Sequence, residues 1–283
     1  MSEWFNAYAK INLTLDIIGR RADGYHLLQM VMQSISLCDR LRITEGKPGI
    51  RILCGRPDVP CDESNTVYKA AAAFFAHANI EPNVAIEIHK KIPSQAGLGG
   101  GSADAAAVLH QLNRMRHTGY SRGTLCDIGV KAGADVPFCI LGGTALAEGI
   151  GDRLTLLPPM PYCFFVICKP PVGVNTGKAY ALADSMASAE PHTDKMLEAI
   201  RSGSLEAIAG SIGNDFERVV PLDDVSSIER IMKRKGALGA CMTGSGSAVY
   251  GVFQNIDAAQ SCQKELAEQY TDVFLCEPVG TVL

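Results

Sequence analysis

A glycine-dense segment at residues 93–102 restricts the fold of this chain more than any other feature. Its sequence is PSQAGLGGGS, with an alternating segment at 84–89 before it and an Ala-rich segment at 103–113 after it. The alternation predicts a strand and the Ala-rich segment a helix. Glycines let the backbone approach a ligand closely, and the first turn of a helix has N–H groups without partners. This order predicts an anion site, for which phosphate is the usual ligand.

Two other phosphate-binding motifs do not fit this loop. The Walker A motif needs a lysine after its glycines, and this loop has none. The dinucleotide motif needs a third glycine, where Ser102 stands, and a second strand after the helix, which the sequence does not predict. A flexible linker is the remaining alternative, but a linker is not expected between a clean strand and an Ala-rich helix.

A second glycine-rich segment, MTGSGS at residues 242–247, lies in the C-terminal half. Alone it is explained equally well by a tight hairpin turn. Two such loops in one chain favour an arrangement in which both face one ligand across a cleft.

The remaining pattern predicts an α+β fold in two halves. Pro158, Pro159 and Pro161 mark the best boundary, which divides the chain into domains at 1–157 and 158–283. The expected strands are 4–17, 27–37, 40–45, 50–54, 84–89, 143–147, 153–157, 162–168, two strands within 240–253, and 271–277. The expected helices are 65–79, 103–113, 121–132, 174–185, 193–202, 204–212, 224–235 and 258–270.

Composition indicates a globular protein and excludes several classes of function. Of the 283 residues 47% are hydrophobic and the net charge is −4, so a large core is expected and a nucleic-acid partner is not. The ten cysteines include no C-x-x-C pair and the N-terminus has no signal-peptide pattern, which predicts a cytoplasmic protein with free, mostly buried thiols. The longest apolar stretch, 162–168, is far shorter than the roughly 20 residues of a membrane span, so no membrane partner is expected.

The motifs together resemble the GHMP kinase superfamily (galactokinase, homoserine kinase, mevalonate kinase and relatives). The similar segments run nearly end to end: AKINL at 9–13, RADGYH at 21–26, 93–106, GADVPF at 133–138, NDFE at 214–217 and 242–251. The glycine loop identifies the superfamily alone. The segments at 21–26 and 133–138 are similar to the branch that phosphorylates the 2-hydroxyl of 4-diphosphocytidyl-2-C-methyl-D-erythritol in the non-mevalonate isoprenoid pathway. Gln95 and Ala103 depart from the family pattern, which often has a small residue and Ser there.

The resemblance implies ATP as phosphate donor, Mg²⁺ with unassigned ligands, and a small-molecule substrate that carries cytidine diphosphate. It also implies a two-domain GHMP kinase fold, with an N-terminal α+β domain of ribosomal-protein-like topology, a C-terminal ferredoxin-like domain and the active site in the cleft between them. The residues it assigns to ATP are Asn65, Pro93, Gln95, Ala96, Gly97, Leu98, Gly99, Gly100, Gly101, Ser102 and Ala103. Asn65 is also a natural N-cap, and both roles are compatible.

Lys10 and Asp135 are the candidate catalytic pair. An ammonium beside a carboxylate would orient the base and favour alkoxide character at the acceptor oxygen. By sequence alone, Lys10 is equally well a solubility residue of an edge strand and Asp135 a turn or N-cap residue. The resemblance decides in favour of catalysis at both positions.

The candidate substrate-binding residues lie in three segments. Asn12 shares a strand face with Lys10, since strand side chains repeat every two residues. The resemblance makes Tyr25 stack on cytosine and His26 bind its edge, and places Thr176 and a second stacking ring, Tyr180, on a helix. Tyr25 and His26 are otherwise exposed loop residues and Tyr180 a core residue.

Three further positions are less defined. Ser102 could donate to phosphate or touch Mg²⁺, and Asp104 favours the dipole of its helix in any case. The segment Asn214-Asp215 also matches the family, but we treat it as structural.

Three rival interpretations remain: another GHMP kinase of homoserine or mevalonate type, a nucleotide-binding regulator without catalysis, and a nucleic-acid-binding module. Tyr25, His26 and Tyr180 argue against the first, because those kinases need no cytosine clamp. The presence of both Lys10 and Asp135 argues against the second, and the acidic charge balance against the third. The sequence leaves open whether the protein is a monomer or a homodimer.

Overall fold

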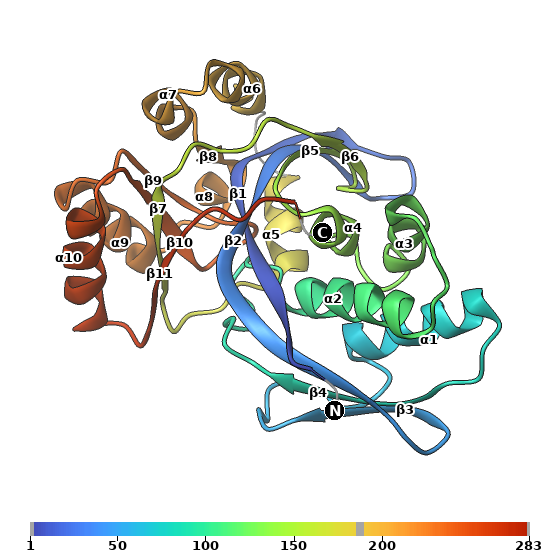
Figure 1. Ribbon diagram of the computed structural model, residues 1–283. Helices are drawn as coiled ribbons and strands as arrows, with labels where there is room; N and C mark the ends of the chain where they lie inside the picture. Colours follow the sequence, from blue (N-terminus) through green and yellow to red (C-terminus); the bar gives the residue numbers. More distant parts are fainter. Residues whose placement is uncertain (1–2, 185–189, 282–283) are drawn as a thin grey trace.

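The computed structural model describes residues 3–184 and 190–281 and shows two β-sheets, each flanked by helices (Figure 1). The α+β fold predicted from the sequence is confirmed. Among the described residues, no helix has the length and apolar character needed to cross a membrane. All ten cysteines are free thiols and six of them are buried, as the sequence predicts.

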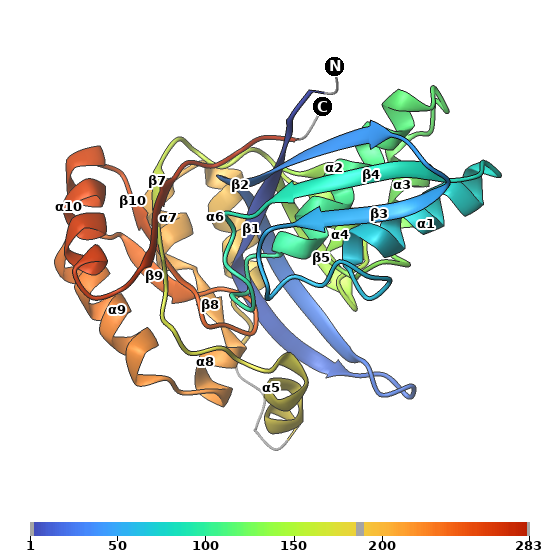
Figure 2. The same cartoon turned by 90° about the horizontal axis from the view of Figure 1, so that it is seen from below.

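The first sheet has seven strands. Five strands are hydrogen-bonded in the order β3-β4-β2-β1-β8. Strand β5 pairs with β2 and with β6. The strands are β1 (Phe5–Arg20), β2 (His26–Glu45), β3 (Gly49–Cys54), β4 (Asn83–His89), β5 (Thr144–Gly149), β6 (Arg153–Leu156) and β8 (Gly213–Asn214). Strands β1 and β2 form a long antiparallel hairpin, whose far end extends away from the other strands (Figure 2).

Strand β1 is the central element for function, because residues 9–16 are buried on both faces. The apolar face, with Ile11 and Leu13, enters the hydrophobic core. The polar face carries Lys10 and Asn12, which are also buried. A buried polar face on a central strand requires partners for its side chains, and these partners form the candidate site.

Four helices belong to the first half: α1 (Thr66–Ala78), α2 (Gly100–Met115), α3 (Arg122–Gly129) and α4 (Val136–Leu141). Helix α2 packs on β1 and β2, and α1 packs on α2 and β3. Apolar residues of α1 such as Phe74 and Phe75, and of α2 such as Leu109 and Leu112, fill the space above the sheet. This packing holds the glycine loop at the start of α2 against strand β1, which carries Lys10.

The second sheet has four strands in the order β11-β7-β10-β9. They are β7 (Phe164–Lys169), β9 (Gly239–Met242), β10 (Val249–Phe253) and β11 (Asp272–Cys276). Helices α9 (Asp223–Arg234) and α10 (Ile256–Ala267) pack on this sheet (Figure 1). The remaining helices lie between the two sheets in sequence: α5 (Thr176–Ala183), α6 (Thr193–Ser202), α7 (Leu205–Gly210) and α8 (Asp215–Val219).

The two halves interlock. Strand β8 belongs to the C-terminal half of the chain but pairs in parallel with β1, at Thr14 and Gly213. The backbone N–H of Val279 donates to the carbonyl of Ser34 at 2.8 Å, which returns the C-terminal segment to the first sheet. A division after residue 157 remains a proposal. All strands of the second sheet follow this residue, but so does β8, which belongs to the first sheet.

Several predicted boundaries were wrong for identifiable reasons. The expected strands 27–37 and 40–45 are one strand, because Asp39 is buried and its carboxylate accepts the N–H groups of Lys91 and Ile92. Helix α2 begins three residues before the predicted start, at Gly100. The short elements α4, β8 and α8 were not predicted, and Ser185, the predicted end of α5, lies outside the described residues.

Candidate active site

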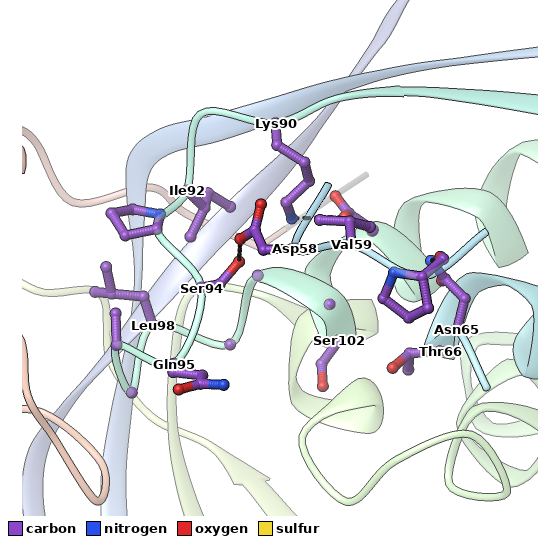
Figure 3. Close-up of a pocket in the computed structure, with 18 of the residues that line it drawn as sticks. Asp58, Val59, Asn65, Thr66, Lys90, Ile92, Ser94, Gln95, Leu98 and Ser102 are labelled. Atoms are coloured by element: carbon purple, nitrogen blue, oxygen red, sulfur yellow. Dashed lines mark hydrogen bonds and ion pairs between the residues drawn. The ribbon is translucent and has the colours of Figure 1, made fainter. Parts of the chain in front are cut away.

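The glycine loop lines a cavity of about 370 Å³ at the N-terminus of α2, the loop cavity (Figure 3). Gly99 is the N-cap with φ of 67°, a left-handed conformation that favours glycine. Gly100, Gly101 and Ser102 form the first turn, so their N–H groups have no partner within the helix. Backbone donors and the positive end of the helix dipole therefore face the cavity, and both suit phosphate.

Asn65 lies at the other end of the loop cavity. Its side chain accepts a hydrogen bond from Val67 N at 2.8 Å, which caps α1, and donates to Pro60 O at 2.6 Å. Asn65 therefore caps a helix and lines the cavity at once. Its predicted proximity to adenine remains a prediction.

A hydrogen bond closes one side of the loop cavity. The Ser94 hydroxyl donates to Asp58 at 2.7 Å, which Figure 3 marks with a dashed line. Hydrogen bonds from Arg56 and Ser94 lower the pKa of Asp58 to about 2. The Asp58 carboxylate is thus ionised at physiological pH and holds the segment around Ser94 in place.

A buried cation, Lys90, also lines the loop cavity, and no motif of the sequence predicts it. Lys90 Nζ lies 2.7 Å from Asp104 and also pairs with Asp39, and all three side chains are at most 5% exposed. Burial raises the pKa of Asp104 well above its ordinary value. Burial would lower the pKa of Lys90, but the charges of Asp104 and Asp39 raise it.

This arrangement changes the role expected for Asp104. Because α2 starts at Gly100, Asp104 lies beyond the first turn, and its carboxylate anchors Lys90 beneath the loop. The sequence signal for Lys90 was its position, directly after a strand and three residues before the glycine loop.

A second cavity of about 290 Å³, the central cavity, adjoins the first, since Gln95, Gly97 and Gly99 line both. Lys10 and Asp135 meet here, with 3.5 Å between Lys10 Nζ and Asp135 Oδ2. Lys10 Nζ also donates to Asn12 Oδ1 at 2.7 Å. The ammonium is therefore held between an amide oxygen and a carboxylate beside the glycine loop.

Asp135 occupies the N-cap position of α4, yet its side chain makes no capping hydrogen bond. The N-cap position considered from the sequence is therefore correct for the backbone of Asp135, but its carboxylate does not bond to the helix and faces Lys10 instead. With 33% of its side chain exposed, compared with 5% for Lys10, Asp135 is accessible from the cavity. It has the exposure that a proton acceptor for a bound hydroxyl needs.

The two glycine loops contact each other directly. A Cβ on Gly97 would overlap the carbonyl group of Thr243, and a Cβ on Gly244 would lie 3.0 Å from Gly97 Cα. The Thr243 hydroxyl accepts the N–H of Asn12 at 2.9 Å, which joins the second loop to strand β1. Asn214 donates to the carbonyls of Met242 and Gly244, both at 2.8 Å, so its side chain has a structural role.

A third cavity of about 620 Å³, the outer cavity, is lined by Tyr25, His26, Thr176 and Tyr180. It shares Asp135, Thr176 and Tyr180 with the central cavity. Burial, followed by the charge of Asp135, raises the pKa of Tyr180 to about 12, so this phenol stays neutral.

The aromatic side chains of the outer cavity do not form two parallel rings with space for a base between them. The His26 ring stacks on Tyr180, with 4.5 Å between centroids and 20° between planes, whereas Tyr25 is 62% exposed. Tyr180 also packs against Phe216 in an edge-to-face arrangement, with 5.0 Å between ring centroids. A base that stacks on Tyr180 from the side of His26 has to displace that ring.

Comparison with known proteins agrees with this geometry. The family model for the GHMP kinases N terminal domain matches residues 65–143, and the model for the GHMP kinases C terminal domain matches residues 196–272. A 4-diphosphocytidyl-2-C-methyl-D-erythritol kinase of Clostridium botulinum (strain Eklund 17B / Type B) is 44% identical over 96% of this chain and 99% of that protein. The chain belongs to the GHMP kinases. The glycine loop and Asp135 both lie within the first matched region.

Solved structures of other GHMP kinases share the fold. A crystal structure of 4-(cytidine 5'-diphospho)-2C-methyl-D-erythritol kinase has a TM-score of 0.81 and 30% identity, and covers 98% of this chain and 100% of its own. A homoserine kinase from Cytophaga hutchinsonii has a TM-score of 0.76 at 18% identity, covering 99% of this chain and 96% of its own, which shows the fold alone. The two-domain GHMP kinase fold is thus confirmed.

Two residues at which this GHMP kinase departs from the family pattern lie in different surroundings. Gln95 has φ of 52° and lines both the loop cavity and the central cavity. Ala103 is buried and does not line the loop cavity, unlike the other ten residues predicted to bind ATP. It faces a separate cavity of about 340 Å³ on the other side of α2.

Three potential metal ligands gather outside these cavities in this GHMP kinase. Asp16, His192 and Asp215 have ligand atoms within 4.8 Å of one another. Asp16 accepts the N–H groups of His192 and Thr193, and Asp215 accepts the N–H of Ile17 at 2.8 Å. These bonds tie α6 and α8 to β1, so the cluster has a structural explanation.

A carboxylate pair lies behind the second glycine loop of this GHMP kinase. Glu217 accepts the backbone N–H of Met242, the residue before Thr243. Burial, followed by the charge of Glu217, raises the pKa of the neighbouring Glu229 to about 8. In the unfolded chain Glu229 releases its proton near pH 4.5. In the folded state Glu229 keeps this proton up to about pH 8.

We expect this proton to make stability depend on pH. A group whose pKa is raised by folding stabilises the folded state below its unfolded pKa, and the benefit is lost as pH rises toward the folded pKa. The melting temperature of the native protein should therefore fall between about pH 5 and pH 8 relative to Glu229→Gln, which has no proton to lose. Thermal denaturation across this range measures the effect, with Glu198→Gln on an exposed face as the control. Parallel profiles for the native protein and Glu229→Gln would contradict the raised pKa.

Proposed function

We propose that this protein phosphorylates the 2-hydroxyl of 4-diphosphocytidyl-2-C-methyl-D-erythritol with ATP, a step of non-mevalonate isoprenoid synthesis. The supporting observation is the position of Asp135. It lines both the central and the outer cavity, and Lys10 beside it is next to the glycine loop. A phosphate donor in the loop cavity and a hydroxyl acceptor reaching in from the outer cavity meet at this carboxylate.

The chemistry follows from these positions. The acceptor oxygen attacks the γ-phosphorus, the bond to the bridging oxygen of ADP breaks, and Asp135 takes the hydroxyl proton. Lys10 orients Asp135 and stabilises negative charge on the acceptor oxygen. The N–H groups at the start of α2 hold the phosphate oxygens, which carry most of the charge in the transition state.

Magnesium, which the resemblance to other GHMP kinases implies, fits the donors at the meeting point of the cavities. Magnesium prefers hard oxygen ligands and is usually held by one or two protein groups together with phosphate oxygens and waters. Ser102 offers such an oxygen where the loop cavity and the outer cavity meet, and its hydroxyl makes no hydrogen bond within the described part of the chain. When bound, the ion would neutralise phosphate charge; we assign Ser102 as its candidate ligand from the protein.

The outer cavity supports recognition of the cytidine end. It is lined by Tyr25, His26, Thr176 and Tyr180, and its volume of about 620 Å³ is the largest of the three cavities. Stacking of a base on an aromatic ring contributes about 1–3 kcal/mol. We assign Tyr25, His26 and Tyr180 to the base, and Asn12 and Thr176 to the diphosphate and sugar alcohol.

A coupled assay of ADP release across several hydroxyl acceptors tests the proposal. We expect turnover with 4-diphosphocytidyl-2-C-methyl-D-erythritol and at least 100-fold lower kcat/KM with 2-C-methyl-D-erythritol 4-phosphate, homoserine and mevalonate, because these lack the base. Equal turnover of homoserine or mevalonate would favour the alternative GHMP kinases. The proposed setting is the cytoplasm, where the ten free thiols of this chain would persist.

A further inference from the structure

A carboxylate at the C-cap of α5 holds the histidine of the outer cavity. Asp184 Oδ1 lies 2.7 Å from His26 Nε2, and Asp184 Oδ2 accepts a hydrogen bond from Arg20 Nη1 at 3.0 Å. Arg20 ends β1 and His26 begins β2, so one side chain joins both sides of the hairpin tip to α5. Arg20, His26 and Asp184 all line the outer cavity.

The spacing on α5 gives Asp184 a second relation to His26. Tyr180 and Asp184 are four residues apart, and residues at this spacing lie on one face of a helix. The same face therefore supplies the ring on which His26 stacks and the acceptor to which its Nε2 is bound. The hydrogen bond to Asp184 fixes the direction of Nε2 within the plane of the imidazole, and the stacking on Tyr180 fixes the tilt of that plane.

We propose that Asp184 is a positioning residue for the cytidine end of the substrate and acts through His26. This inference rests on the proposed function, because it assigns the outer cavity to the base. Asp184 fixes the ring of His26 at the wall of the cavity, and its link to Arg20 keeps the hairpin tip close to α5. Without Asp184, only the stacking on Tyr180 restrains His26, so part of the order of the cavity wall has to be established when substrate binds.

The two contacts of Asp184 differ in expected importance. Arg20 is 55% exposed, and exposed ion pairs contribute little because water screens them. The His26 side chain is only 11% exposed, so its hydrogen bond to Asp184 competes much less with water. We therefore expect the His26 contact to dominate the effect of a substitution.

Steady-state kinetics of three variants test the proposal. Asp184→Ala should raise KM for 4-diphosphocytidyl-2-C-methyl-D-erythritol about tenfold, with kcat within about twofold and KM for ATP unchanged. Asp184→Asn keeps an oxygen that accepts from Nε2–H, so its increase should be about threefold. Arg20→Gln removes the exposed ion pair and the hydrogen bond from Arg20 Nε to Gly24 O, and its increase should also stay below that of Asp184→Ala.

The matched control is Glu265→Gln, an acid-to-amide change on α10. Glu265 pairs with Arg234 and Lys235 at the end of α9. This variant should leave all kinetic constants unchanged. An unchanged KM for the cytidine substrate in Asp184→Ala would overturn the proposal. A parallel loss of kcat and of both affinities, without partial rescue by Asn, would also overturn it, because that pattern indicates a structural role.

Binding of cytidine 5'-diphosphate, measured by calorimetry without ATP, separates this inference from the proposed function. If the native protein fails to turn over the cytidine substrate, the proposed function fails. Weaker binding of cytidine 5'-diphosphate to Asp184→Asn than to the native protein supports the role of Asp184 in either case. Equal binding by the native protein and by Asp184→Asn and Asp184→Ala overturns it; Asp184→Asn is the variant to measure if Asp184→Ala does not fold.

Discussion

Replacing Asp135 by Asn should lower kcat by about 10²–10⁴, the usual contribution of a general base, while ATP still binds. The amide cannot accept the hydroxyl proton, and it no longer neutralises the ammonium of Lys10 at 3.5 Å. Because the Asp135 side chain makes no capping bond to α4, the substitution should not unfold the protein. Single-turnover kinetics and calorimetric titration with ATP measure the two quantities separately.

Asp127→Asn is the control for this experiment, since Asp127 is exposed on the neighbouring helix α3 and lines none of the three cavities. It should have the activity of the native protein. If Asp135→Asn also retained native turnover, Asp135 would not be the base. If it lost ATP binding together with turnover, its role would be in the nucleotide site.

Replacing Gly97 by Ala is expected to have the second large effect. Gly97 has φ of 74°, which costs a side-chain-bearing residue about 1–3 kcal/mol. The added methyl would also overlap the backbone carbonyl of Thr243, and overpacking of this kind costs about 1–3 kcal/mol more. We expect a loss of about 2–6 kcal/mol in the free energy of unfolding, seen as a melting temperature lower by roughly 4–12 °C, at about 2 °C per kcal/mol for a chain of this length. We also expect kcat/KM to fall at least 100-fold, because the loop can no longer hold phosphate beside Lys10.

Gly210→Ala provides the comparison at a site with space. No atom lies within 4 Å of a Cβ placed on Gly210, which ends α7. Alanine favours helix over glycine by about 1 kcal/mol, so stability should be equal or slightly higher. A Gly97→Ala protein as stable and active as the native one would show that the two glycine loops do not pack in solution as they do here.

The sequence allowed the local elements and the phosphate loop to be predicted because they depend on short-range patterns. Alternation at 84–89 and the glycines that follow determine a strand, a loop and a helix start, all within 20 residues of one another. The α+β class and most helices followed from the same reasoning. The ends of α2 and the continuity of β2 did not, because Asp39 is satisfied by backbone N–H groups more than 50 residues away.

The site was predictable only in part. Lys10 and Asn12 followed from the period of a strand, and Asp135 from the motif at 133–138. Lys90, Asp184 and Thr243 were missed, because each acts through partners distant in sequence. The Tyr180–Asp184 spacing and the place of Lys90 before the loop were visible, but nothing local indicated which side chains they would meet.

The hydrogen bond from Asn12 N to Thr243, together with the backbone contact between Gly97 and Gly244, has a consequence for how activity arises. The strand that bears Lys10 and the loop that faces phosphate are both braced by residues from the far end of the chain. A fragment that stops before the second sheet would hold every group proposed for proton and phosphate transfer, yet lack the support that aligns them. Adding the missing fragment in trans should then restore turnover, and its concentration dependence would measure how strongly one half organises the other.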